Sequence, residues 1–182
     1  IRHIGITNHR LGVAQAAIDS GNFETLQFPF CYLCTEKDLQ LLRACEAADM
    51  GFIAMKGLAG GLLNNAKACM NFIKQYDNVV PIWGIQTEEE LDEWLALENA
   101  GDFAITDEIK AIIERDRKEL CGNFCRSCGY CLPCPAGIDI PQAARMSRLL
   151  RRSPYKPYMS DEWHKKMHMI DDCRGCGACA SR

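Results

Sequence analysis

The sequence has none of the features that mark a membrane or secreted protein. No apolar run approaches the ~20 residues that a membrane-spanning helix needs, and no signal peptide precedes the first predicted strand. The chain also lacks a large excess of either charge, because its 21 basic and 24 acidic residues leave a net charge of only −3. We therefore expect a cytoplasmic protein with no nucleic-acid partner and no membrane partner.

The basic residues are scattered along the chain, apart from one group. This group consists of Arg145, Arg148, Arg151 and Arg152, which lie within a segment of helical periodicity. Such a group favours a solvated helix face, and contact with an acidic partner is the alternative.

Cysteine is present in excess. Twelve cysteines among 182 residues, with no secretory signal, argue against a disulfide framework and for metal ligation in a reducing compartment. Eight of them lie from Cys121 onward, so the composition changes near residue 118. We therefore predict two domains, residues 1–118 and residues 119–182. The other four cysteines lie in apolar surroundings, and we expect them to be buried and inert: Cys31, Cys34, Cys45 and Cys69.

Strand and helix patterns alternate in the first domain. Strand patterns begin near residues 3, 26, 52 and 79, and a helical pattern follows each of them. This alternation predicts an α/β fold with parallel strands joined by right-handed crossovers. Four short βα units make half of a (β/α)8 TIM barrel, which needs eight units and ~250 residues. A small open doubly wound sheet is the alternative.

A half barrel leaves two bare strand edges and an open apolar face, which parallel sheets rarely tolerate. We therefore expect the missing barrel half to come from upstream sequence, a second chain or a second copy of this one. Thr35 and Thr87 are each followed by an acidic residue three positions later, which predicts capped helix starts. The charged helix predicted at residues 107–118 is interpreted as a connector to a small, mainly α second domain, with helices near residues 140–150 and 160–169.

Seven cysteines of the second domain form two runs in which successive cysteines are three positions apart. The first run is Cys125, Cys128, Cys131 and Cys134, and the second is Cys173, Cys176 and Cys179. Thiolates are soft ligands that iron–sulfur clusters and zinc both prefer. Consecutive steps of three that end in Cys134-Pro135 favour a 4Fe-4S cubane, because zinc usually takes two separated pairs. Zinc remains the alternative.

This pattern resembles bacterial-type ferredoxin domains, in which the cysteine before a proline binds the other cluster. The resemblance implies two 4Fe-4S clusters. The first would be held by Cys125, Cys128 and Cys131, and the second by Cys134, Cys173, Cys176 and Cys179. The fourth ligand of the first cluster is expected in a Cys-Pro just beyond Arg182, so the domain would be truncated at its C-terminus, and Cys121 is the alternative ligand. One departure is that two residues separate Cys131 from Cys134, where the usual pattern has three.

The ends of the predicted strands resemble those of aldo/keto reductases. Ile4-Gly-Ile-Thr-Asn8 is similar to the motif that ends the family's fifth strand, and Gln27 stands where its sixth strand carries a glutamine. Residues 51–62 are similar to the seventh strand with its pyrophosphate-covering loop, and residues 80–91 to the eighth strand and helix. The resemblance covers residues 1 to about 100, and one subgroup of the family also carries a ferredoxin-like C-terminal domain.

The resemblance implies hydride transfer between NAD(P)H and a carbonyl or alcohol. Thr7, Asn8 and Gln27 would bind the nicotinamide carboxamide. Gly57 would lie in the pyrophosphate-covering loop, and Lys56 would meet a phosphate or a substrate. The family's catalytic residues belong to earlier strands, so no catalytic residue is expected in this chain. The substrate, the electron donor and the choice between NAD and NADP stay open. The alternative function is a non-catalytic electron-transfer module on a barrel scaffold, which serves a redox protein partner.

Overall fold

The computed structural model describes residues 1–120 and 125–181. The chain divides into two compact units, residues 1–121 and 122–182, close to the change in composition near residue 118. Cys121, the alternative cluster ligand, lies outside the described residues. No helix in the described part of the chain is long and apolar enough to cross a membrane.

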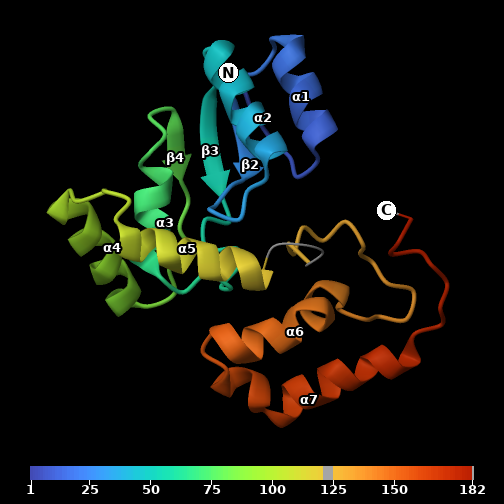
Figure 1. The fold of residues 1–182 in the computed structure, drawn as a ribbon. Helices are drawn as coiled ribbons and strands as arrows, with labels where there is room; N and C mark the ends of the chain where they lie inside the picture. Colours follow the sequence, from blue (N-terminus) through green and yellow to red (C-terminus); the bar gives the residue numbers. More distant parts are fainter. Residues whose placement is uncertain (121–124, 182) are drawn as a thin grey trace. The chain divides into compact units, whose positions relative to one another are not determined.

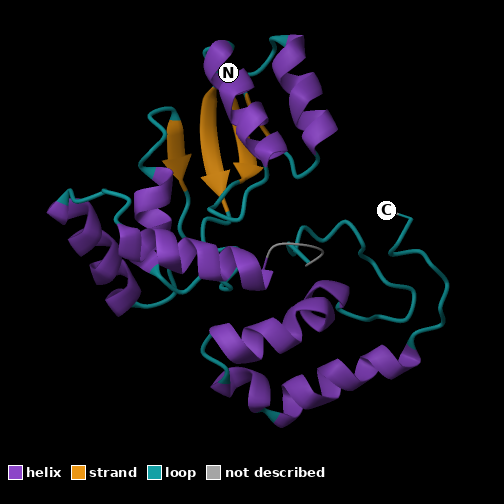
Figure 2. Cartoon of the chain, in the orientation of Figure 1, coloured by secondary structure: helices purple, strands orange, loops and turns teal. Residues whose placement is uncertain are grey.

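The first unit is built on a four-stranded parallel sheet with strand order β1-β2-β3-β4. The strands are β1 (Gly5–Thr7), β2 (Thr25–Pro29), β3 (Gly51–Met55) and β4 (Val79–Pro81). The connections between them are the helices α1 (Leu11–Ser20), α2 (Glu36–Ala47) and α3 (Ala66–Ile73). Figure 2 shows strands of this sheet side by side as orange arrows. The predicted alternation of strands and helices and the parallel pairing are confirmed.

The two faces of the sheet differ in burial. Alternate residues of the central strands are buried, including Leu26, Phe28, Phe52 and Ala54, each at most 3% exposed. Side chains alternate between the faces of a strand, and the residues between these, such as Gln27 and Ile53, are only half-buried. Right-handed crossovers between sequential parallel strands place all connecting helices on one face. The buried face is therefore the one that α1, α2 and α3 cover.

Helix ends in the first unit follow the local sequence signals. The Thr35 hydroxyl accepts from the Asp38 backbone N–H, and the Asp38 carboxylate accepts from the Thr35 N–H, which completes the predicted capping box before α2. The box predicted at Thr87, before α4 (Glu88–Ala100), forms only in part. Thr87 accepts from the Glu90 N–H, but the Glu90 carboxylate accepts from the N–H of Gln86 instead of Thr87.

Helix α5 (Asp107–Leu120) belongs to the core of the first unit, so its interpretation as a mere connector is wrong. Its buried residues are Ile109, Ile113, Asp116 and Leu120, which recur at helical spacing. The hydroxyl of the buried Tyr32 donates to the Asp116 carboxylate at 2.5 Å, and Arg117 Nε donates to the Tyr32 carbonyl at 2.6 Å. The helix thereby holds the segment that follows β2.

The second unit contains the helices α6 (Ile140–Arg152) and α7 (Asp161–His168) (Figure 1). A short 3-10 turn, Lys156–Met159, lies between them, and a second one, Met169–Asp172, follows α7. Asp139 and Ser160 cap the two helices through their side chains, and the predicted helices are confirmed. The inner face of α6 carries Pro141, Arg145 and Leu149. Because Arg145 is 5% exposed, the predicted solvated arginine face is wrong for this residue.

Candidate metal centre and strand-end site

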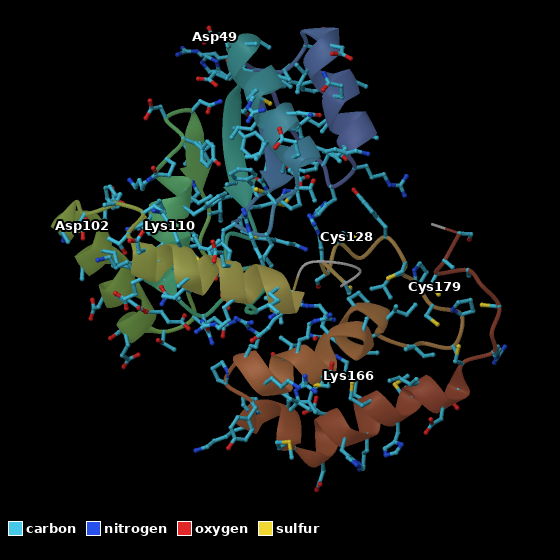
Figure 3. All side chains as sticks on the ribbon, in the orientation of Figure 1. Asp49, Asp102, Lys110, Cys128, Lys166 and Cys179 are labelled. Carbon is cyan, nitrogen blue, oxygen red and sulfur yellow. The ribbon has the colours of Figure 1, made fainter. Side chains whose placement is uncertain are left out.

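The cysteines of the second unit lie in two loops, the first loop (residues 125–131) and the second loop (residues 173–179). The first loop and Cys134 precede α6, whereas the second loop follows the 3-10 turn after α7. Cys128 and Cys179, one from each loop, are labelled in Figure 3. All seven predicted ligands are free thiols. Three are half-buried (Cys125, Cys131 and Cys134), and four are exposed (Cys128, Cys173, Cys176 and Cys179).

The two loops have left-handed residues and a turn at matching positions. The third and fifth residues of each loop have a left-handed φ: 55° at Ser127 and 81° at Gly129 in the first, 62° at Gly175 and 70° at Gly177 in the second. A matching turn closes each loop, since Leu132 N donates to the Gly129 carbonyl at 2.9 Å and Ala180 N to the Gly177 carbonyl at 3.0 Å. The two runs therefore match in structure as well as in sequence.

Hydrogen bonding and nearby charges in the first loop affect how readily its thiols ionise. The Ser127 N–H donates to Cys125 Sγ at 3.4 Å. The pKa of Cys131 is raised, first by burial and further by the negative charge that Cys125, Cys128 and Cys179 would carry as thiolates. The end of the second loop thus lies within electrostatic reach of the first loop. Thiolates gathered in this region repel one another and favour a cationic group among them.

The thiols do not converge on a single point. Within residues 1–120 and 125–181, no three Cys, His, Asp or Glu side chains are close enough together to hold a metal ion. The donor set nevertheless fits iron–sulfur clusters, because seven uncombined thiols in two matched loops supply the soft ligands that iron–sulfur clusters require. Binding would complete the convergence, since metal binding and folding of a small loop-rich domain are coupled.

Four of the five predicted cofactor-binding residues lie near one another on β1, β2 and the end of β3, although Gln27 is the middle residue of β2 and not its carboxyl end. Thr7 is the register partner of Gln27, and the Asn8 N–H donates to the Gln27 carbonyl at 3.0 Å. Gln27 Nε2 contacts Met55 Sδ at 3.8 Å, and Lys56 follows Met55 directly. The pKa of His9 is lowered by burial and then by the charge of Lys56, so this lysine lies near the end of β1.

Asn8 and Gly57 have structural roles that the resemblance does not describe. Asn8 Oδ1 accepts from the Arg10 N–H at 2.6 Å and so holds the turn before α1. A Cβ at Gly57 would lie 2.4 Å from the ring of Trp83, and Trp83 stacks on Trp94 with ring centroids 4.0 Å apart. Gly57 is therefore required by the packing of this indole pair.

The four cysteines of the first unit fall into two classes. Cys45 and Cys69 are buried, as predicted, but Cys31 and Cys34 are half-buried, so the prediction is wrong for this pair. The sequence does carry a signal for them, because Cys31-Tyr-Leu-Cys34 has the two-residue spacing of redox-active dithiols. Sequence reasoning also missed Tyr32, Asp116 and Arg145, whose burial depends on contacts between distant segments.

Comparison with known proteins bears on the second unit. A family model described as a 4Fe-4S dicluster domain matches residues 124–182. No curated protein matches the chain. Residues 124–182 are thus similar to a 4Fe-4S dicluster domain, which supports iron–sulfur clusters and an electron-transfer role for this segment.

Proposed function

We propose that this chain is part of an iron–sulfur oxidoreductase in which two 4Fe-4S clusters carry electrons. The observation that carries the proposal is the pair of matched cysteine loops within the segment similar to a dicluster domain. Cys125, Cys128 and Cys131 would hold one cluster. Cys134, Cys173, Cys176 and Cys179 would hold the other. Each cluster, when bound, accepts and releases one electron at a time.

The residues around the thiols favour this ligation. The Ser127 N–H stabilises charge on Cys125, because hydrogen bonds to the charged form favour that form. Arg145 is a buried cation. Burial lowers the pKa of its guanidinium, and the negative charges that Cys125 and Tyr158 would carry raise it. A guanidinium keeps its charge in proteins, so it places positive potential beside the first loop. Both groups would offset the negative charge of a thiolate-bound cluster.

We also propose that the first unit is half of a (β/α)8 barrel, completed by a further segment or chain. Support comes from the sequential order of the four parallel strands, because right-handed crossovers between such strands place their connecting helices on one face. Further support comes from apolar side chains that remain exposed in β4 and after it, with Val80 64% and Ile82 45% exposed. In such barrels the ligands bind at the carboxyl ends of the strands, and Thr7, the last residue of β1, is paired with Gln27 of β2.

This placement supports nicotinamide-dependent redox chemistry on a carbonyl or alcohol. Thr7 and Gln27 supply a hydroxyl and an amide that suit a carboxamide, and the Lys56 ammonium suits a phosphate. A non-catalytic electron-transfer module with a redox partner is the second candidate. It is favoured by the roles of Asn8 and Gly57 in holding the fold.

The cluster proposal is tested by iron and acid-labile sulfide analysis after anaerobic purification. Both should be present in the parent chain. Cys128→Ala should lose part of the iron, whereas Cys45→Ala, at a buried cysteine of the first unit, should keep all of it. Zinc without sulfide in the parent, or equal iron loss in the two variants, would refute the proposed ligand set.

The nicotinamide proposal is tested by calorimetric titration of the complete protein with NADH and NADPH. Gln27→Ala should weaken binding about tenfold, because each lost hydrogen bond costs ~0.5–1.5 kcal/mol. Gln15→Ala, on α1, is the matched control, because the Gln15 amide donates to the Asp19 carboxylate of the same helix. If neither cofactor binds, or if Gln27→Ala binds like the control, the electron-transfer module is the better account.

A further inference from the structure

A tight turn directly after β2 carries two cysteines, Cys31 and Cys34. The Cys34 N–H donates to the Cys31 carbonyl at 2.9 Å, which closes the turn. The first and last Cα atoms of such a turn lie less than about 7 Å apart. Disulfides form when the Cα atoms are roughly 4.4–6.8 Å apart. The backbone therefore already holds the two residues at a separation compatible with a bond between them.

The middle of this turn is fixed by helix α5. Tyr32 is fully buried, its hydroxyl donates to Asp116, and its carbonyl accepts from Arg117 at 2.6 Å. Cys31 and Cys34, which flank Tyr32 and Leu33, are half-buried and not fully enclosed. Because the turn is held in advance, closing a bond across it orders little additional chain.

The other two cysteines of this unit are poorly suited to thiol chemistry. Burial raises the pKa of Cys45 to about 11. The pKa of Cys69 is raised further by burial, with smaller contributions from Cys31 and Asp116. Only the thiolate attacks a disulfide, so these thiols stay unreactive near neutral pH. Cys69 is nevertheless near Cys31, which makes a Cys31–Cys69 bond the competing arrangement to be tested.

We propose that Cys31 and Cys34 form a redox-active dithiol at the carboxyl end of β2, a two-electron couple separate from the cysteine loops of the second unit. The oxidant is a low-molecular-weight disulfide. One cysteine thiolate attacks it, forms a mixed disulfide and releases one small thiol. The second thiolate attacks the cysteine sulfur of the mixed disulfide, forms the Cys31–Cys34 bond and releases the second small thiol. Two protons and two electrons pass from the cysteines to the two small thiols.

The experiment uses the full chain with its metal content intact, under anaerobic conditions. The protein is equilibrated in buffers of varied ratio of reduced to oxidised glutathione, quenched with acid, alkylated and digested with trypsin. Cleavage after Arg10 and Lys37 leaves both cysteines in one peptide, residues 11–37, whereas Cys45 and Cys69 fall in residues 44–56 and 68–74. The expected result is a reversible loss of two hydrogens and two alkyl groups within peptide 11–37 alone.

Matched variants sharpen the result. Cys34→Ser should abolish the loss of two hydrogens and leave at most a mixed disulfide with glutathione, and Cys45→Ser should behave like the parent. Full alkylation of both cysteines at the most oxidising ratio would overturn the proposal. A bond that joins peptide 11–37 to peptide 68–74 would overturn it too, because the pair would then be Cys31 with Cys69.

Discussion

Gly177→Ala should weaken binding of the cluster that we propose for the second loop, although the added methyl group would cause no steric clash. Gly177 has a φ of 70°, and a Cβ added there meets no heavy atom within 4 Å. The cost of the substitution is therefore confined to the backbone. A left-handed conformation costs an ordinary residue about 1–2 kcal/mol, which corresponds to a factor of about 5–30 in an equilibrium constant.

Competition with an iron chelator measures this effect, as the chelator concentration that removes half of the bound iron. That concentration should fall about 5–30-fold in Gly177→Ala, in line with the backbone cost. Gly129→Ala should act similarly on the first loop, since its φ is 81° and its Cβ position is also open. Gly84→Ala is the control, because its Cβ position is open and its φ is not left-handed. Equal iron retention in Gly177→Ala and Gly84→Ala would refute the reasoning.

Three further predictions follow from buried groups. In an EPR-monitored redox titration, Arg145→Gln should lower the one-electron reduction potential of the cluster proposed at the first loop by about 59 mV, a tenfold shift toward the oxidised form. A shift of equal size in the exposed Arg151→Gln would contradict this prediction. Tyr32→Phe should lower the free energy of unfolding in urea by about 1–3 kcal/mol, because Asp116 loses its hydroxyl donor while buried; an unchanged midpoint would contradict it. Burial raises the pKa of Cys45 from 9.0 to about 11, so this thiol ionises at lower pH in the unfolded state than in the folded state. The free energy of unfolding should therefore fall as pH rises from 9 to 11, and it should fall less in Cys45→Ala.

Much of the fold could be predicted because its determinants are local. Apolar runs followed by helical periodicity gave the four βα units, and the Thr35 capping box gave the start of α2. The parallel order of the strands follows from the short crossovers between them. These features depend on residues close together in the chain, so a single sequence contains them.

Other features depend on contacts between distant segments. The charges of α5 suggested a connector, yet Asp116 in this helix is buried, and the hydroxyl of Tyr32, which is distant in sequence, donates to its carboxylate. The arginines of α6 look alike in sequence, but Arg145 lies on the buried face of the helix together with Pro141 and Leu149. Periodicity indicates which residues share a face, and the packing partner decides whether that face is buried.

The candidate site shows the same division. The spacing of the cysteines predicted two equivalent runs, and the left-handed residues of the two loops stand at matching positions. The ligand set itself stays a prediction. The half-burial of Cys31 and Cys34 did not follow from their apolar surroundings in sequence, because the turn that holds them is anchored by α5.

Native mass spectrometry of the anaerobically purified chain tests the central claim most directly. The account predicts a mass above that of the polypeptide by two 4Fe-4S clusters, as expected for the segment similar to a dicluster domain. It also predicts that Cys128→Ala and Cys176→Ala each lose one cluster and keep the other. A parent chain that carries zinc, or a single cluster that either substitution removes, would contradict the account.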